Sequence, residues 1–105
     1  MAQYGEYGGP IKKTMVKQTQ AASNGSNVDV TITHEDQTGN ISSMAVVCLI
    51  TTSGNAFVEV GASATANSLP LTSSDQLIAK IPSGGTLGVW GNGGTPTITI
   101  TKFVA

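Results

Sequence analysis

The sequence predicts an all-β protein: a small antiparallel β-sandwich or barrel of six to seven strands with an extended N-terminal arm. Its 105 residues are enough for one domain with a modest core. The chain contains 13 Gly, 10 Ser and 14 Thr, and residues of these kinds are poor helix formers. From residue 28 onward, short apolar runs alternate with turn residues every ~8–12 positions, which is typical of sandwiches and barrels.

The first three predicted strands lie between residues 28 and 60. Val28, Val30 and Ile32 alternate with polar residues, which predicts a strand over 28–34 with one buried face. The most apolar run of the chain follows, and we expect it to form a strand that is buried on both faces at the centre of a sheet. A three-residue turn then leads into another apolar strand, so the last two are predicted to pair as a β-hairpin. These two strands are predicted over 44–52 and 56–60.

Four further extended segments are predicted in the second half of the chain, after a loop of small residues. The segment around Pro70 is extended, because the residue before a proline avoids the helical region. Residues 73–76 match a capping box for a helix over 75–81, but Pro82 would end such a helix after barely two turns. The alternation of apolar residues over 77–81 favours a strand instead. Pro96 has no N–H to donate, so the last strand is expected to begin at an edge or outside the ladder. The four segments are predicted over 69–71, 77–81, 86–90 and 97–104, with a glycine-rich hairpin loop over 91–94.

The chain divides by composition into an extended N-terminal arm and linker, residues 1–27, and a β-sandwich domain, residues 28–105. Gly and Pro at positions 8–10 interrupt regular structure, and the linker ends in a polar run. Ile11 and Met15 lie at helical spacing, but their segment is short and uncapped, so we expect it to be extended. Twenty extended residues reach at most ~66–72 Å, which is enough to cross a neighbouring subunit.

The arm carries the predicted partner-binding residues. Two aromatic side chains stand in a glycine-rich tail with no core of their own, so they are expected to dock on a partner, or else to belong to a disordered terminus. The lysines of the arm are expected to touch phosphate or an acidic protein surface, or else to be solvated. The predicted partner-binding residues are Tyr4, Tyr7, Ile11, Lys12, Lys13, Met15 and Lys17. Trp90, beside the glycine-rich loop, is expected either to cap the core or to anchor an interface.

The sequence offers little for catalysis or for binding a cofactor or metal. His34 is the one ready general base, and Cys48 lies in the most apolar run, where a buried thiol is expected. No Gly-x-Ser-x-Gly elbow is present. His34, Glu35 and Asp36 invite a metal site, but a single histidine without a second ligand cluster does not complete one. The sequence therefore predicts a protein that is not an enzyme and holds no metal or cofactor.

Charge and hydropathy also limit the partners. The chain has five cationic residues, all lysine, and a net charge of -1, so no basic patch for a nucleic acid is expected. No signal peptide is recognised at the N-terminus and no apolar stretch approaches ~18 residues, so no membrane partner is expected. One cysteine allows no intramolecular disulfide, so the domain is expected to be stabilised by its core or by oligomerisation.

Several segments of the second half resemble small structural proteins of tailed bacteriophages. They are Gly54-Asn-Ala-Phe-Val-Glu-Val-Gly61 with its small-residue loop, Leu69-Pro-Leu71, Leu77-Ile-Ala-Lys-Ile-Pro82, Leu87-Gly-Val-Trp90 and Thr97-Ile-Thr-Ile-Thr101. The resemblance covers about residues 54–104 and rests on pattern and composition. It implies a β-sandwich-like virion component, often trimeric, with no catalytic residues to carry over.

The expected function is therefore that of a capsid decoration (cement) protein, which binds and stabilises the phage head shell without enzymatic activity. Its expected partners are the major capsid protein and further copies of itself, with a homotrimer favoured. It would be made in the host cytoplasm and lie on the capsid surface of the virion. Two alternatives remain open: a tail- or fibre-associated module, and a glycan-binding β-sandwich that would use Trp90, Tyr4 and Tyr7.

Overall fold

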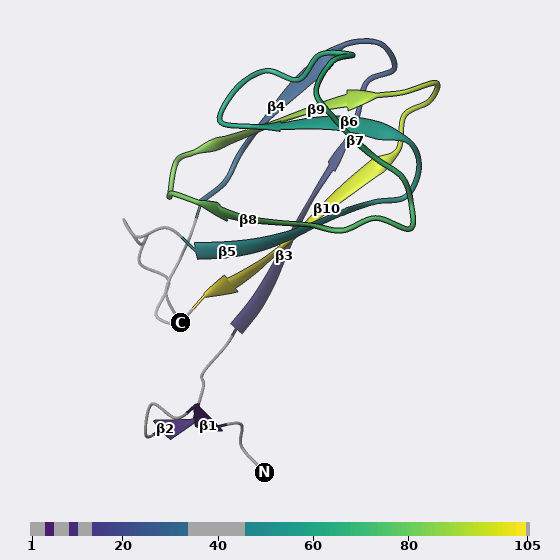
Figure 1. Cartoon of the computed structure of the whole chain (residues 1–105). Coiled ribbons are helices and arrows are strands. Elements are labelled where there is room, and N and C mark those ends of the chain that lie inside the picture. Colours follow the sequence, from purple (N-terminus) through teal and green to yellow (C-terminus); the bar gives the residue numbers. More distant parts are fainter. Residues whose placement is uncertain (1–3, 6–8, 11–13, 34–45, 105) are drawn as a thin grey trace.

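The computed structural model describes residues 4–5, 9–10, 14–33 and 46–104, and these contain no helix. Two antiparallel four-stranded sheets are stacked on each other (Figure 1). The first sheet has the order β3-β10-β5-β8 and the second β4-β9-β6-β7, while β1 and β2 pair with each other. The strands are β1 (Tyr4–Gly5), β2 (Gly9–Pro10), β3 (Thr14–Ala21), β4 (Asn27–Thr31), β5 (Val46–Thr52), β6 (Ala56–Val60), β7 (Leu69–Leu71), β8 (Leu77–Ile81), β9 (Thr86–Gly91) and β10 (Thr97–Val104).

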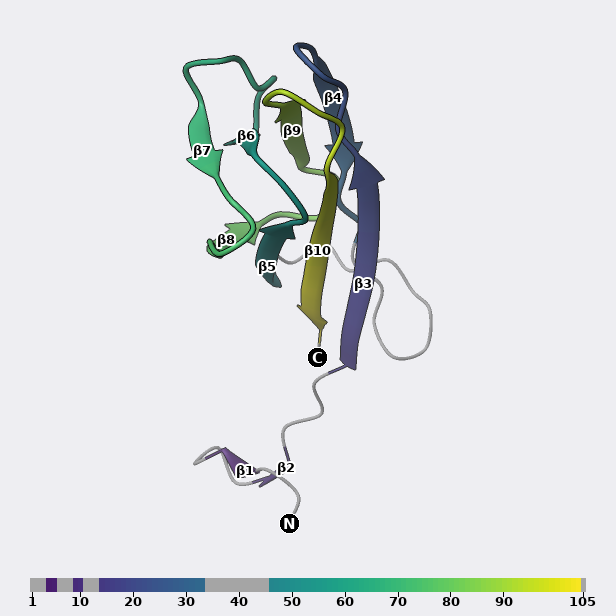
Figure 2. The ribbon, with the colours of Figure 1, turned by 90° about the vertical axis from the view of Figure 1, so that its right-hand side faces the viewer.

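The predicted all-β sandwich is confirmed, with eight strands in its two sheets rather than six or seven. The additional strand is β3, which was expected to belong to the free arm. It pairs along its whole length with β10, from Ala21 opposite Thr97 to Thr14 opposite Val104 (Figure 2). The sandwich therefore begins at Thr14, not at residue 28. The reason for the difference is that the inward positions of β3 hold Gln18 and Gln20, so its sequence shows no apolar alternation.

The predicted hairpin over 44–60 is wrong, because β5 and β6 belong to different sheets. The three residues between them carry the chain from one sheet to the other, where Ser53 N donates to Thr97 O at 3.0 Å. The glycine-rich segment 91–94 likewise joins β9 to β10 across the sandwich and is no hairpin loop. Of its glycines, Gly93 alone has a positive φ, 83°. A short turn can join two strands as a hairpin within one sheet or carry the chain to the other sheet. The stacking of the apolar faces decides between these two arrangements.

The core lies between the two sheets, and among the described residues it is made by alternate positions of every strand of the sandwich except β3. The one-sided burial predicted for the first strand is confirmed, since Val30 and Ile32 are buried. In β5, Cys48 and Ile50 are fully buried, but Val47 is 42% exposed, so the expected burial of both faces is wrong. The largest fully buried side chains are Ile32, Ile50, Ile81, Leu87, Ile98, Ile100, Val58, Val89 and Cys48.

Two local predictions of the second half are confirmed. Residues 77–81 form strand β8 and no helix. Pro96 precedes β10 and stays outside its ladder, although its carbonyl oxygen accepts a hydrogen bond from Ala22 N at 2.8 Å.

Candidate interaction surfaces

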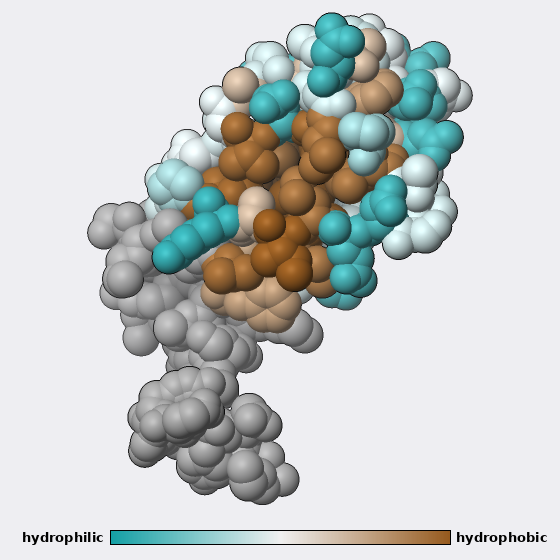
Figure 3. All heavy atoms as spheres, viewed as in Figure 1, coloured by the Kyte–Doolittle hydropathy of each residue, from teal (hydrophilic) through white to brown (hydrophobic). Residues whose placement is uncertain are grey.

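The outer side of the first sheet carries an apolar surface, which we call the apolar face: Val47 and Leu49 of β5, Ile78 of β8 and Phe103 of β10. The strand register places Leu49 beside Ile78, and Val47 beside Phe103. Ile78 is 69% exposed and Val47 42%, while Leu49 and Phe103 are half-buried. The space-filling view shows apolar side chains gathered over β5 and β8 and onward across the edge of the sandwich to β6 (Figure 3). Contiguous apolar surface of this kind marks an interaction site more often than isolated exposed residues do.

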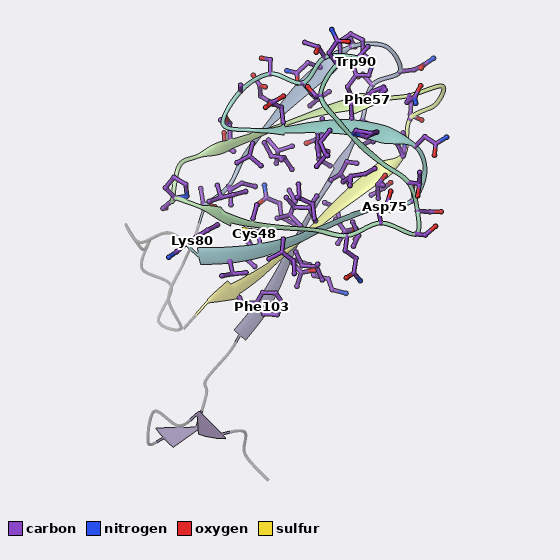
Figure 4. All side chains as sticks on the ribbon, in the orientation of Figure 1. Cys48, Phe57, Asp75, Lys80, Trp90 and Phe103 are labelled. Atoms are coloured by element: carbon purple, nitrogen blue, oxygen red, sulfur yellow. The ribbon has the colours of Figure 1, made fainter. Side chains whose placement is uncertain are left out.

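Two lysines stand on the same side of the first sheet. Lys80 is opposite Val47 in the β5–β8 ladder, and Lys17 is opposite Thr101 in the β3–β10 ladder. Both side chains are exposed. Figure 4 shows Lys80 at the end of β8 that lies away from Asp75. The described residues of this outer side include no Asp or Glu, so the charge around the apolar face is positive.

The outer side of the second sheet has a different character. Trp90 of β9 is flanked in register by Asn27 of β4 and Phe57 of β6, and Phe57 is in turn opposite Pro70 of β7. We call these four residues the aromatic row. Trp90 and Phe57 are half-buried and lie next to each other (Figure 4). Trp90 thus lies on the outside of a sheet and not among the residues of the buried core.

The neighbouring row of the second sheet carries two carboxylates. Asp29, Gly88 and Glu59 are opposite one another in register. Asp29 is exposed and accepts a hydrogen bond from Asn27 Nδ2 at 2.8 Å, and Glu59 accepts one from Ser68 Oγ at 2.9 Å. The described residues of this side include no lysine, so its charge is negative.

The small-residue loop after β6 folds over the middle of this row. Ala64 is 1% exposed and its N–H donates to Asn27 Oδ1 at 2.7 Å. A Cβ at Gly88 would meet the backbone of Ala62 and Ala64, so only glycine permits this close approach. The small residues that the sequence shows as a plain loop therefore form a cover over the second sheet.

The residues predicted to bind a partner are not brought together into one described site. Lys17 lies on the outer side of β3, and Met15 is opposite Phe103 in the ladder. Tyr4 lies in β1, opposite Pro10. Tyr7, Ile11, Lys12 and Lys13 lie outside the described residues, as do His34, Glu35 and Asp36. The sequence did not lead us to the exposed face of β5 and β8. The residue that could have indicated it is Lys80, a charged side chain within the otherwise apolar strand β8.

Among the described residues, the interior holds one thiol and one ammonium group, in neighbouring strands. Cys48 is opposite Lys102 in the β5–β10 ladder. Lys102 is only 6% exposed, and its Nζ donates to Thr33 O at 2.8 Å and Gln18 Oε1 at 3.3 Å. Burial raises the pKa of the Cys48 thiol, and the nearby ammonium of Lys102 opposes that rise. The raised pKa and complete burial leave Cys48 without the exposed thiolate that a nucleophile needs.

Neither a metal cluster nor a membrane-spanning helix occurs in the part of the chain that the structure describes. No three His, Cys, Asp or Glu side chains gather there in a way that could hold an ion. None of its elements is a helix long and apolar enough to cross a bilayer. A shallow pocket of about 380 Å³ lies between two inter-sheet connections, lined by Ser53, Gly54, Asn55, Asn92, Gly93, Gly94, Thr95 and Pro96, and it offers amides and backbone groups but no charged side chain.

Comparison with known proteins leaves the family open. No protein-family model and no curated protein sequence matches the chain. A solved chain from the disulfide-linked pili that form Bacillus endospore appendages is similar, with a TM-score of 0.42 and 14% identity over 90% of this chain and 92% of that chain. A likeness at this level carries no inference about function.

Proposed function

We propose that the chain is a non-enzymatic structural protein of a phage particle, a capsid decoration protein that binds and stabilises the head shell. The observation that carries the proposal is the separation between the sandwich and the segment that precedes it. Residues 1–13 come before β3, and the described ones among them form β1 and β2, which pair with each other as a separate two-stranded sheet. The resemblance of residues 54–104 to phage structural proteins supports the same reading.

A decoration protein must contact the shell through residues that its own fold does not need for packing. Tyr4 and Tyr7 supply large, rigid contact area at low entropic cost, and Lys12 and Lys13 supply charge. The core residues that the structure describes run from Ala22 to Ile100 along the chain, and they pack between the two sheets. The shell contact is therefore assigned to residues 1–13, which is a shorter arm than the composition alone indicates.

The test is a deletion of residues 2–12 compared with the full chain. We expect the shortened protein to keep its β-sheet circular dichroism and its cooperative unfolding, and to lose co-sedimentation with phage heads. A Tyr4→Ala/Tyr7→Ala variant should weaken binding to heads, while a matched Gln3→Ala/Glu6→Ala variant should not. Unchanged binding by the shortened protein would refute the role of the arm.

Fractionated particles test the function itself. The full chain should co-purify with heads, and gold-labelled antibody should decorate the shell in electron micrographs. Label confined to the tail would identify a tail or fibre component instead. Absence of the chain from every particle fraction would overturn the proposal.

A further inference from the structure

We propose that two copies of the chain associate through the open side of the sandwich: β8 of one copy pairs antiparallel with β8 of the other, and the exposed apolar side chains beside it are buried in the same contact. The open side is the side on which the edge strands β7 and β8 lie (Figure 2), and its apolar residues are Val60, Leu69, Leu77 and Ala79. The inference does not rest on the proposed function, which assigns the shell contact to residues 1–13 and leaves this side unused.

The second sheet has two apolar side chains that point toward the first sheet but are not covered by it. Val60 is opposite Leu87 in the β6–β9 ladder, and Leu87 is fully buried. Leu69 is opposite Val58 in the β6–β7 ladder, and Val58 is buried as well. Residues that are opposite each other point to the same side of a sheet. Val60 and Leu69 therefore point inward, and yet they are 41% and 47% exposed.

Strand β8 forms the other margin of the open side. Leu77 is opposite Ile50 in the β5–β8 ladder, and Ala79 is opposite Cys48. Both partners are fully buried, so Leu77 and Ala79 also face inward, but they are only half-buried. Figure 3 shows that the apolar surface runs from β8 across this side to β6. A partner that covers this surface must therefore reach both sheets.

The backbone of β8 is open to pairing along one side. It is the last strand of the first sheet, and among the described strands it pairs with β5 alone. Such an edge accepts a further strand through main-chain hydrogen bonds. The other edge strands are less suited, because β7 has three residues and contains Pro70, and because Gln18 Nε2 of β3 donates to Thr31 O of β4 at 2.9 Å.

The sequence of β8 fits a second β8 in one register. Opposite side chains must point to the same side of the joined sheet, and pairing of all five residues then places Ala79 opposite Ala79 of the second copy. Leu77 meets Ile81 of the other copy on the inner side, and Ile78 meets Lys80 on the outer side. The two lysines are thus not opposite each other, and the methylene groups of each lysine cover an Ile78 that is 69% exposed.

A second copy also covers the second layer, which selects it over an isolated strand. The two-fold axis of this pairing passes through the Ala79 pair, perpendicular to the first sheet, so both second sheets lie on the same side of a joined sheet of eight strands. Val60 and Leu69 of one copy then lie toward the same residues of the other. An extended peptide would pair with β8 but would leave Val60 and Leu69 in water.

Charge favours the antiparallel orientation. Lys80 and Asp75 are exposed and stand near opposite ends of β8 (Figure 4). Antiparallel pairing brings the lysine end of each strand beside the aspartate end of the other, whereas parallel pairing would bring like charges together. The contact is two-fold, so it uses the same patch on both copies and association stops at the dimer.

Paired cysteines test the register. Under mild oxidation, a mixture of Ile78→Cys and Lys80→Cys chains should form a disulfide-linked dimer, because opposite residues have Cα atoms about 4.5–5.5 Å apart. Each variant alone should stay unlinked, because its two cysteines would be diagonal neighbours about 7–8 Å apart. The unmodified chain is the control for Cys48, which is fully buried. Linkage of Ile78→Cys alone, or an unlinked mixture, would overturn the proposal.

Sedimentation velocity over a range of concentrations tests the apolar part of the contact with two matched valines. Val60 is 41% exposed on the open side, and Val47 is 42% exposed on the outer side of the first sheet. We expect the full chain to be in a monomer–dimer equilibrium, Val60→Ser to dissociate about tenfold more readily, and Val47→Ser to associate like the unmodified chain.

Three results of the sedimentation experiment would contradict the inference. They are a full chain that stays monomeric at every concentration, a trimer or larger species, and a loss of association in Val47→Ser that Val60→Ser does not show. Circular dichroism checks that each variant is folded. If Val60→Ser does not fold, the cysteine pairs decide the question, because both of their positions are exposed and outside the core.

Discussion

Replacing Gly88 by alanine tests how closely the small-residue loop covers the second sheet. The new Cβ would meet the backbone of Ala62 and Ala64, and backbone cannot swing aside as a flexible side chain does. The loop must therefore move outward. That movement breaks the hydrogen bond from Ala64 N to Asn27 Oδ1, which is 2.7 Å long, and exposes the Ala64 methyl group, which is now 1% exposed.

The expected loss of stability follows from these contacts. The hydrogen bond contributes about 1 kcal/mol and the buried methyl about 0.8 kcal/mol. Residual crowding adds roughly 1 kcal/mol, because an overpacked site relaxes only in part. Alanine restricts the unfolded chain and returns about 0.7 kcal/mol. The net destabilisation is about 2 kcal/mol, which corresponds to a fall in Tm of roughly 8–16 °C for a domain of this size.

Thermal and urea unfolding followed by circular dichroism measure the effect. Gly94→Ala is the matched control, because a Cβ there meets nothing within 4 Å and Gly94 has no positive φ. We expect the control to stay within about 0.5 kcal/mol of the unmodified chain. A Gly88→Ala protein as stable as this control would show that the loop does not need its close approach to the sheet.

Further predictions concern the core and the thiol. Ile100→Ala, at a fully buried position, should lower the free energy of unfolding in urea by about 2–5 kcal/mol. Ile78→Ala, at an exposed position, should lower it by less than about 0.5 kcal/mol. Equal losses in the two variants would contradict the assignment of the inner and outer sides of the first sheet. Because burial raises the pKa of Cys48, the folded chain holds the thiol proton to higher pH than the unfolded chain does, so stability should fall as pH rises above about 9. Cys48→Ala should lack this part of the pH dependence, and an identical pH profile would contradict it. Iodoacetamide at neutral pH should alkylate Cys48 only on unfolding, and rapid labelling of the native chain would show that the thiol is accessible.

Most strands of the sandwich could be predicted because their inward residues are apolar at every second position. Val30 and Ile32 in β4 and Ile98 and Ile100 in β10 show this alternation, which is a local property of the chain. Strand β3 escaped the same reasoning because its inward positions carry glutamines. The amide of Gln18 is accommodated by a hydrogen bond, in which its Nε2 donates to Thr31 O at 2.9 Å.

The candidate surfaces could not be predicted in the same way. An apolar run such as 46–50 looks the same whether a strand is covered on one side or on both. The exposed side of Val47 and Ile78 becomes visible only when the sheet order is known, because nothing in the chain packs on that side among the described residues. The aromatic row likewise depends on which strands are neighbours, since Phe57 and Trp90 are far apart in sequence.

The sequence by itself determined the all-β class, the position of most strands and the burial of Cys48, because each follows from side-chain periodicity within a few residues. Only the tertiary structure decided that β5 and β6 part into different sheets, that β3 completes the first sheet, and that Gly88 receives the loop that follows β6. In each case the local sequence of a strand is compatible with several neighbouring strands. They are made by the whole set of apolar faces, which can all be buried together in only a few arrangements.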